Sequence, residues 1–381
     1  MDPDAARRYL ASYPFLGLLL LDAYPAEYPA VMAAFDAEAQ LFLERLTPGQ
    51  VSQLLFGEHE GAVPAQLQRF MDDSVLPRRT ALPRHPDPKG AQVASMVAVV
   101  RELLPAGASV LDAGCGVGKL SQALDGLGCY SVLGVDRDAA LVARASALGL
   151  QHASFAVRAL GPAGLPATTA LIALHGCGDF GADVLDGVES ALVLQVPCCY
   201  QSMRHFPRSR ALGGLSFEDQ AHRRAFLNLA CGSFGMDVGR ILAKRLRRAA
   251  MQPLVDYFRD RHGLQPGQAI CKRSRRDEIG TYLAEQVGAL KRKAGCARPA
   301  EAIVRDVYGD FGAFFRQFCA DNRQRYLVQI FLSGVCARTV ELIAITDRAA
   351  RLQERGYRVH TRELCAEEVT PRNVLLVGER E

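Results

Sequence analysis

The sequence of 381 residues lacks any uninterrupted apolar run near the about 20 residues that a membrane-spanning helix needs. Its most signal-like stretch, residues 15–21, is preceded by Asp2 and Asp4 and ended by Asp22, and no small-residue cleavage site follows it. We therefore expect a buried helical segment there and no membrane partner. The chain also contains no internal repeat and no low-complexity tract, so a repeat array is not expected.

A disulfide framework is missing as well. The 11 cysteines are odd in number and are spread from Cys115 to Cys365. Disulfide scaffolds are typically small secreted domains with an even set of cysteines. We expect reduced thiols and a cytoplasmic setting, with a nuclear one as the alternative.

Charge of one sign is not in large excess, because the net charge is only +4. The charge is nevertheless uneven: between Arg240 and Lys293, 14 Lys or Arg stand against 5 Asp or Glu. A basic block on a nearly neutral chain favours a polyanionic partner, whereas its ordinary structural interpretation is a solvated helical face.

The hydrophobic pattern changes along the chain. Residues 1–84 show helical spacing, with Thr47-Pro48 as a helix start, and the proline-rich stretch 77–89 indicates a boundary. Short apolar strands then alternate with helical stretches. The five predicted strands are 109–113, 131–135, 154–157, 170–174 and 191–196. This alternation predicts a parallel sheet that is covered on both faces.

Residues 205–300 and 311–356 again show helical patterns, and two final strands, 357–364 and 373–378, flank a polar turn. A closing hairpin after a parallel sheet is typical of S-adenosylmethionine (SAM) dependent methyltransferases. The predicted fold class is therefore α/β: a doubly wound, Rossmann-like, mostly parallel class I SAM-dependent methyltransferase sheet. An N-terminal helical region precedes it, and a helical insertion comes before the final β-hairpin. The predicted segments are 1–84 (helical), 85–204 (SAM-binding core), 205–340 (basic insertion) and 341–381 (helix and hairpin completing the sheet).

One glycine-rich segment carries the strongest chemical signal. The first strand runs into Asp112, and Gly114, Gly116 and Gly118 follow at alternate positions before a helix begins. Glycines tolerate positive φ and let the backbone approach a ligand. The N-terminus of a helix favours a carboxylate such as that of SAM.

Two acids favour SAM over a dinucleotide in this turn. Asp112 ends the strand, as the methyltransferase pattern requires, and Asp136 ends the next strand, where an acid can bind ribose hydroxyls. The predicted cofactor residues are Asp112, Gly114, Cys115, Gly116, Gly118, Asp136, Arg137 and His175. The alternatives to a SAM site are a nicotinamide or flavin site and a packing turn without a ligand. The acid or amide that often binds adenine after the third strand is missing from residues 157–160.

Polar motifs follow the next two strands. The fourth strand ends in His-Gly-Cys-Gly-Asp (175–179) and the fifth in Pro-Cys-Cys-Tyr (197–200). Ligands of an open parallel sheet bind at the carboxyl ends of its strands. Both motifs are therefore expected beside the methyl group of SAM.

These two motifs resemble the family of methyltransferase-like protein 25 and its paralogue named for a ribosomal-RNA adenine dimethylase domain. Further matches, in the family's order, are Asp87-Pro88-Lys89, Phe206-Pro207-x-Ser209, Leu-x-Leu-Ala-Cys (227–231) and Thr-Pro-Arg-Asn (370–373). The resemblance runs from about Lys89 to the C-terminus. Gly176, where Ala or Leu is usual, and Gln201, where His is frequent, depart from it. A related motif pair occurs in a tRNA ribose 2′-O-methyltransferase family, so the resemblance implies RNA as a substrate class.

The same motifs suggest how an acceptor is activated. SAM carries its own reactivity, so the enzyme mainly positions a nucleophile in line with the methyl group. His175 and Asp179 are candidate bases, and Tyr200 is a candidate to stack on or orient a nucleobase. We predict these three as catalytic, and Cys198 and Cys199 as substrate-binding. The alternative is that His175 caps the strand end and the cysteines fill buried space.

A zinc site of His175, Cys177, Cys198 and Cys199 is a further interpretation, because four N/S ligands close such a site. Against it, adjacent Cys198 and Cys199 point to opposite faces if the strand continues, and the usual Cys-x2-Cys spacing is absent. We therefore predict no metal ligands, with zinc left open.

Basic clusters lie in the insertion at 244–248, 272–276 and 291–293. The predicted substrate-binding residues among them are Lys244, Arg245, Arg247 and Arg248, because such clusters bind phosphates in a salt-dependent way. The sequence therefore predicts a SAM-dependent methyltransferase that acts on RNA or on a ribosomal or other translation-associated protein. The rival function is a SAM-binding fold without catalysis that serves as an interaction module. The missing adenine acid and the absence of an Asn/Asp-Pro-Pro-Tyr motif favour this rival.

Overall fold

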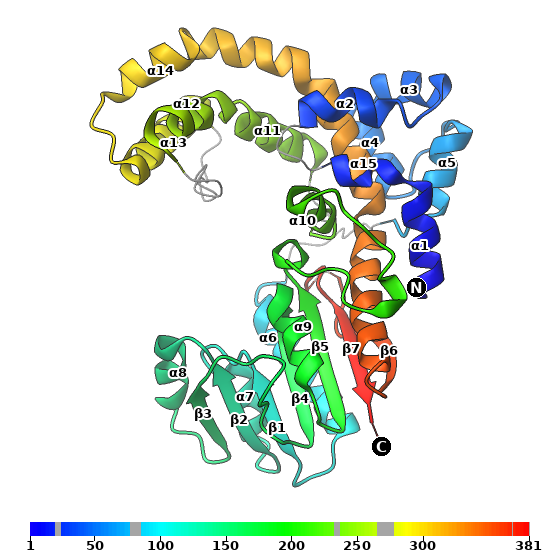
Figure 1. Cartoon of the computed structure of the whole chain (residues 1–381), viewed down its shortest axis with the longest axis vertical. Coiled ribbons are helices and arrows are strands. Elements are labelled where there is room, and N and C mark those ends of the chain that lie inside the picture. Colours follow the sequence, from blue (N-terminus) through cyan, green and yellow to red (C-terminus); the bar gives the residue numbers. More distant parts are fainter. Residues whose placement is uncertain (20–23, 77–84, 232–236, 265–277, 368, 381) are drawn as a thin grey trace. The chain divides into compact units, whose positions relative to one another are not determined.

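The computed structural model describes residues 1–19, 24–76, 85–231, 237–264, 278–367 and 369–380 (Figure 1). The chain divides into two compact units. The first unit comprises 1–21, 69–235 and 333–381, and the second comprises 22–68 and 236–332. The four segments expected from the sequence stay a prediction about domain organisation.

The first unit is built on a seven-stranded sheet in the order β3-β2-β1-β4-β5-β7-β6 (Figure 1). Its strands are β1 (Ser109–Ala113), β2 (Ser131–Asp136), β3 (Ala153–Val157), β4 (Ala170–Cys177), β5 (Leu192–Cys198), β6 (Arg358–Glu363) and β7 (Val374–Glu379). The first five strands run parallel, and β7 runs antiparallel to both β5 and β6. The predicted class I methyltransferase sheet with its closing hairpin is confirmed.

Helices cover both faces of this sheet. The elements involved are α6 (Pro88–Leu103), α7 (Lys119–Asp125), α8 (Ala139–Ser146), α9 (Gly178–Gly187) and α15 (Phe311–Gln353). Successive strand residues face opposite sides, so Val110 packs with α6 and α7, and Leu111 packs with α9 and the end of α15. The apolar strands are therefore buried on two sides, as their continuous hydrophobicity predicts.

One connection differs from the predicted alternation of strands and helices. Residues 158–169, between β3 and β4, contain no helix. This stretch holds Gly161, Pro162, Gly164 and Pro166. Each of these residues interrupts helical backbone, and their close spacing leaves no room for a helical turn.

The remaining helices lie outside the sheet. They are α1 (Pro3–Ser12), η1 (Pro14–Leu18), α2 (Tyr24–Met32), α3 (Ala37–Glu44), α4 (Pro48–Leu55), α5 (Ala65–Asp72), η2 (Tyr200–Ser202), η3 (Arg210–Leu212), α10 (Gln220–Leu229), α11 (Val238–Ala249), α12 (Gln252–His262), α13 (Ile279–Ala294) and α14 (Ala300–Tyr308). The predicted helix start at Thr47-Pro48 is confirmed, because Thr47 and Gln50 form a capping box. The segment predicted as a buried helix begins as η1, in which Phe15 and Leu16 are buried, and residues 20–21 lie outside the described residues.

The second unit has a core of its own. Leu254, Phe258, Val287, Leu290 and Ile303, from α12, α13 and α14, pack in one buried cluster. The aromatic residues at the start of α15 lie against the same cluster. This core shows how the basic insertion folds as helices rather than as an extended arm.

Helix α15 is long and apolar enough to cross a membrane by length and composition alone. However, 89% of its most apolar stretch is buried inside the protein. The stretch is not a continuous apolar run, since Arg338 and Glu341 lie in the same part of the helix. A buried helix of this kind is typical of a protein core, and the expectation of no membrane partner stays a prediction.

Candidate active site

The predicted cofactor loop connects the end of β1 to the start of α7. Gly114, Gly116 and Gly118 have φ values of 76°, 56° and 78°. The amides of Gly114 and Cys115 both donate to the carbonyl of Val135, at 2.8 and 3.1 Å. The chain therefore turns sharply against the end of β2 in a backbone conformation that favours glycine.

A side chain at each glycine would meet a different environment. A Cβ on Gly114 would lie 3.2 Å from the ring of Phe180, and a Cβ on Gly118 would lie 3.0 Å from the ring of Phe155. A Cβ on Gly116 would meet nothing within 4 Å. Gly114 and Gly118 are therefore needed for packing, whereas the backbone of Gly116 faces open space. This open cradle fits the approach of a cofactor to the loop.

Asp136 lies directly against that loop. Its Oδ2 accepts a hydrogen bond from the Gly116 amide at 3.0 Å, and its Oδ1 accepts one from the Asp138 amide at 3.0 Å. Each carboxylate oxygen can accept more than one hydrogen bond, so both keep the capacity to bind ribose hydroxyls. The next residue, Arg137, is exposed.

Asp112 supports the loop from the protein interior. It is only 3% exposed, and Ser121 Oγ donates to its Oδ2 at 2.6 Å. Burial raises the pKa of Asp112 to about 6. The bond joins the end of β1 to the first turn of α7, so Asp112 fixes the two elements between which the loop runs. The neighbouring Cys115 is also buried, and burial raises the pKa of its thiol to about 12.

His175 lies near the end of β4, the strand that pairs with β1, and its side chain is exposed. The surrounding chain still desolvates the imidazole, and this effect, followed by the charge of Lys89, lowers the pKa of His175. The ring is therefore neutral at pH 7 and can accept a proton. Lys89 comes from the first turn of α6, within the Asp-Pro-Lys motif.

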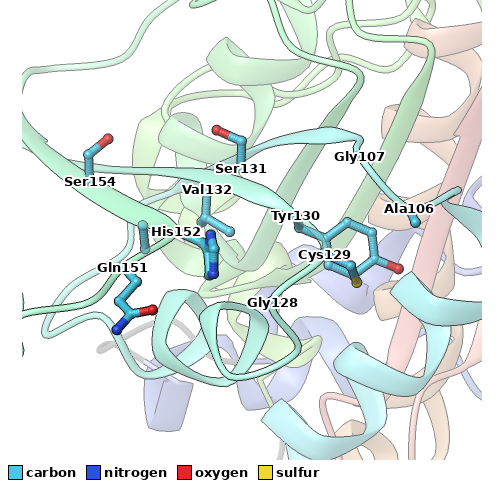
Figure 2. Close-up of a pocket in the computed structure, with 11 residues that line it drawn as sticks. Ala106, Gly107, Gly128, Cys129, Tyr130, Ser131, Val132, Gln151, His152 and Ser154 are labelled. Atoms are coloured by element: carbon cyan, nitrogen blue, oxygen red, sulfur yellow. The ribbon is translucent and has the colours of Figure 1, made fainter.

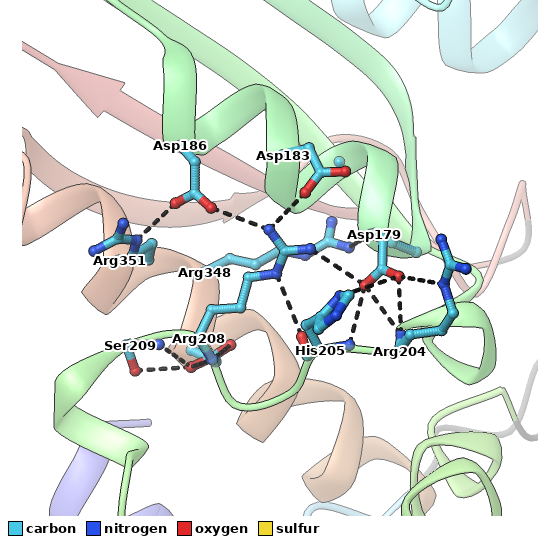
Figure 3. A network of polar contacts seen from close by, with 12 residues as sticks. Asp179, Asp183, Asp186, Arg204, His205, Arg208, Ser209, Arg348 and Arg351 are labelled. Atoms are coloured by element: carbon cyan, nitrogen blue, oxygen red, sulfur yellow. Dashed lines mark hydrogen bonds and ion pairs between the residues drawn. The ribbon is translucent and has the colours of Figure 1, made fainter. Parts of the chain in front are cut away.

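Asp179 has a structural task in the loop 204–208 (Figure 3). Its carboxylate accepts hydrogen bonds from the amides of Arg204 (3.0 Å) and His205 (3.3 Å), and from the Arg208 guanidinium (3.3 Å). Burial alone would raise the pKa of Asp179, but these donors lower it overall. A carboxylate that is stabilised in its charged form is a weak proton acceptor, so this placement disfavours the predicted role of Asp179 as a base.

Arg208 extends this network along α9 (Figure 3). Its guanidinium also donates to Asp183 at 2.6 Å and to Asp186 at 3.0 Å. Arg351, near the end of α15, donates to the other oxygen of Asp186 at 2.6 Å. The acidic face of α9 therefore connects the loop after β5 to the long C-terminal helix.

Tyr200 is fully buried, at 0% exposure. Its hydroxyl lies 3.1 Å from Glu341 Oε1 and 3.1 Å from the Pro197 carbonyl, and the guanidinium of Arg372 lies 5.6 Å from its ring centroid. No face of the ring is open to a nucleobase, so the structure contradicts the predicted stacking role of Tyr200. The sequence analysis expects the residues after β5 to be accessible to an acceptor, whereas in the structure α15 covers Tyr200.

Glu341 explains the Thr-Pro-Arg-Asn motif near the C-terminus. This carboxylate is 1% exposed and is paired with Arg338 at 2.6 Å and with Arg372 at 3.0 Å. Arg338 also donates to Asn373 Oδ1 at 3.1 Å. The motif therefore fixes the start of β7 to α15.

Three sulfur atoms meet at the ends of β4 and β5. Cys177 pairs with Cys198 across the two strands, with their Sγ atoms 3.1 Å apart. The strand ends at Cys198, and Cys199 has a left-handed backbone with φ of 51°. The three Sγ atoms lie within 4.8 Å of one another. Cys198 and Cys199 were expected to point to opposite faces only if the strand continued; because β5 ends at Cys198, this objection to a zinc site does not apply.

The predicted substrate-binding residues of the insertion lie on α11, in the second unit. Lys244 and Arg248 are exposed, whereas Arg245 and Arg247 are half-buried, and Arg245 donates to Gln329. The cluster 272–276 lies outside the described residues. The role of these side chains in substrate binding stays a prediction.

A surface pocket of about 630 Å³ lies at the other end of the sheet (Figure 2). Its lining includes Gly107, Tyr130 and His152, which come just before β1, β2 and β3. These are the amino ends of the strands, whereas the cofactor loop and the two polar motifs lie at the carboxyl ends. We therefore assign no cofactor to this pocket.

Sequence reasoning missed several residues that build the site. Phe180 lies against Gly114 and so brings the start of α9 to the cofactor loop. Its place directly after the 175–179 motif was an available signal. Glu341 and Arg348, which bonds to the ends of β4 and β5, carried no local signal, because their partners are far away in the sequence.

One family model matches part of the chain. Residues 88–205 match the model of a family described as a methyltransferase domain. The chain has no match among curated proteins. A TehB-like SAM-dependent methyltransferase from Corynebacterium glutamicum is 22% identical over 28% of this chain and 60% of that chain, with a TM-score of 0.23. The chain thus spans less than two thirds of that protein.

Two further solved structures are similar over longer stretches. Magnesium protoporphyrin IX methyltransferase from Synechocystis, with bound SAH, is 18% identical over 44% of this chain and 71% of that chain (TM-score 0.24). Coclaurine N-methyltransferase, bound to N-methylheliamine and SAH, is 12% identical over 87% of each chain (TM-score 0.25).

The strand order confirms the predicted class I methyltransferase sheet, and the family match covers its first five strands. Residues 88–205 thus match a methyltransferase domain, and the match ends just after the Pro-Cys-Cys-Tyr motif.

Gly116→Ala tests the cradle. Its methyl group would enter the open space in front of the loop, so we expect the affinity for SAM to fall by about 50-fold or more, measured by isothermal titration calorimetry. Gly149→Ala is the matched control, since Gly149 has a similar φ of 63° and open space around it, outside the loop.

Both variants carry the strain of an alanine at positive φ, on the order of 1–2 kcal/mol. The control is expected to bind SAM within about twofold of the wild type. Similar losses in the two variants would show that backbone strain, and not the cradle, sets the affinity.

Proposed function

We propose that the protein transfers the methyl group of SAM to RNA or to a translation-associated protein, with RNA as the favoured acceptor. The observation that carries this proposal is the exposed His175 on the strand beside the cofactor loop. A neutral imidazole at that edge provides the base that a hydroxyl or amine acceptor needs.

Separate residues bind the cofactor and accept the proton. When bound, SAM supplies an activated methyl group that a nucleophile takes in one displacement. Gly116 and Asp136 are suited to bind the cofactor. The backbone of Gly116 faces open space, and its amide donates to the carboxylate of Asp136. His175 accepts the proton that the acceptor loses. Of the three residues predicted as catalytic, His175 is the one that this proposal retains.

The charge near His175 supports an anionic acceptor. Lys89 is exposed, and its charge is the second cause, after desolvation, of the lowered pKa of His175. In the second unit, Lys244 and Arg248 are exposed on α11. Lysine and arginine side chains of this kind bind phosphates independently of base sequence.

The sequence motifs support the same substrate class. We propose that the chain is related to the methyltransferase-like protein 25 family, on the two strand-end motifs and the further matches from Lys89 onward. The cytoplasmic setting inferred from the cysteines is compatible with a substrate from the translation machinery.

The alternative function is a SAM-binding module without catalysis. It is favoured by a specific observation: Asp179 and Tyr200 are both occupied by structural bonds. This alternative predicts cofactor binding without methyl transfer, so cofactor binding cannot separate the two functions.

Transfer of labelled methyl groups from SAM into a cell lysate separates them. Aliquots are treated with RNase or with protease after the reaction, and Gly116→Ala serves as the inactive control. We expect the label to reside in macromolecules from which RNase releases it and protease does not. Label that only protease releases identifies a protein acceptor, and label no higher than that of the control supports the inactive module.

His175→Gln tests the proposed base. Loss of the proton acceptor is expected to lower kcat by about 100-fold while the affinity for SAM stays unchanged. The pKa of His175 lies below its ordinary value, so the wild-type rate should rise with pH through that lowered pKa and level off near neutrality.

The variant should lack this acidic limb of the pH profile. His152→Gln is the control, since His152 is exposed in the same unit at the amino ends of the strands. An acidic limb that persists in His175→Gln would assign the titration to another group.

A further inference from the structure

The three cysteines at the ends of β4 and β5 form a site that the methyl-transfer proposal does not use. We propose that Cys177, Cys198 and Cys199 bind one Zn²⁺ ion through three thiolates, with the fourth position of the metal open to a water molecule. Zinc sites with three protein ligands and one exchangeable ligand are an established class.

The spacing of the sulfur atoms suits such an ion. A tetrahedral zinc ion with Zn–S bonds of about 2.3 Å separates two of its sulfur ligands by roughly 3.8 Å. Cys177 and Cys198 have their Sγ atoms 3.1 Å apart, and all three Sγ atoms lie within 4.8 Å of one another. The required separation is longer than the 3.1 Å between Cys177 and Cys198 and shorter than the 4.8 Å limit for all three pairs, so modest side-chain rotation brings the thiolates to the metal.

An unusual backbone conformation places the thiol of Cys199. Within the described ranges, Cys199 is the one residue other than glycine that has a positive φ. Ser202 stabilises this turn, since both its amide and its hydroxyl donate to the Cys199 carbonyl, at 2.9 and 2.7 Å. A left-handed backbone is strained for a residue other than glycine. Here that conformation directs Cys199 back to the other two sulfurs.

A buried charge beside the cluster favours the metal. Arg348 is 1% exposed, and its Nη atoms donate to the carbonyls of Gly176 and Gly178 and to Gln195 Oε1, which are all neutral acceptors. A buried cation needs a compensating negative charge. The buried carboxylate of Asp347 acts on this guanidinium, and three thiolates with Zn²⁺ add one net negative charge beside it. Three thiolates with a monovalent ion would leave an excess of negative charge.

The site is also accessible. Cys198 is buried and Cys177 half-buried, whereas Cys199 reaches solvent, so an ion can enter from the side of Cys199. His175 is not one of the three clustered ligands, so the imidazole remains available as a base. Zinc binding and methyl transfer therefore use different side chains of the same edge.

Metal analysis of the full chain tests the proposal. The protein is purified under reducing conditions, incubated with ZnCl₂, desalted and analysed by mass spectrometry for metal and protein content. We expect about one equivalent of zinc in the wild type and less than about a tenth in Cys177→Ser, Cys198→Ser and Cys199→Ser. Cys129→Ser is the matched control, since Cys129 is partly buried at the amino ends of the strands, and it should keep its zinc.

Spectroscopy of the wild type gives a test that does not depend on how the variants fold. Co²⁺ in place of Zn²⁺ should give a thiolate-to-cobalt charge-transfer band in the near ultraviolet and intense visible bands of tetrahedral cobalt. Their absence, or a zinc content below about a tenth of an equivalent in reduced wild type, overturns the proposal. A Cys177–Cys198 disulfide that forms in preference to metal binding also overturns it. A protein without zinc that still transfers methyl groups would overturn this inference alone and leave the proposed function intact.

Discussion

The buried guanidinium of Arg348 fixes the carboxyl edge of the sheet. It reaches from α15 to the carbonyls of Gly176 and Gly178, at the end of β4 and the start of α9, and to the side chain of Gln195 in β5. A buried charge without these acceptors would cost several kcal/mol. The approach is so close that a Cβ on Gly181 would lie 2.4 Å from the Gly176 carbonyl and 2.9 Å from Arg348. The strand ends that carry His175 and the cysteines are therefore positioned by a helix more than 100 residues later in the chain.

The same helix organises the segment that follows β5. Glu341 receives the Tyr200 hydroxyl and two arginines, and Asp347 accepts hydrogen bonds from the amides of Arg208 and Ser209 at 2.8–3.0 Å. Both carboxylates are 1% exposed, so each of them depends on these donors for its charge. The C-terminal part of α15 is thus part of the architecture of the site, because Glu341, Asp347 and Arg348 fix the site in place. The cofactor loop, in contrast, is built from local elements, β1, β2 and the first turn of α7.

This difference explains which features the sequence could predict. All seven strands were predicted within a few residues of their observed ends. Six of them are short, mostly apolar runs between polar or glycine-rich turns, whereas β6 (Arg358–Glu363) is a polar edge strand. The cofactor loop was predicted for the same reason, since its glycines and Asp136 act through nearby backbone. The structural roles of Asp179 and Tyr200 could not be predicted from the local sequence. Their partners, Arg208 and Glu341, lie 29 and 141 residues away, and no local pattern shows that a side chain is already occupied. The convergence of the cysteines depends on one backbone conformation, at Cys199.

Hydrogen exchange of Arg348→Met tests most directly whether one buried cation organises this edge. Methionine fills similar space without a donor, so the variant leaves three buried acceptors without their partner. We expect faster exchange at 172–182 and 193–203 in Arg348→Met, whereas exchange in β2 and in the cofactor loop stays unchanged. Arg358→Met is the control, because Arg358 is an exposed residue of β6, and it should exchange like the wild type. Wild-type exchange rates at both strand ends in Arg348→Met would show that this buried cation does not organise the edge.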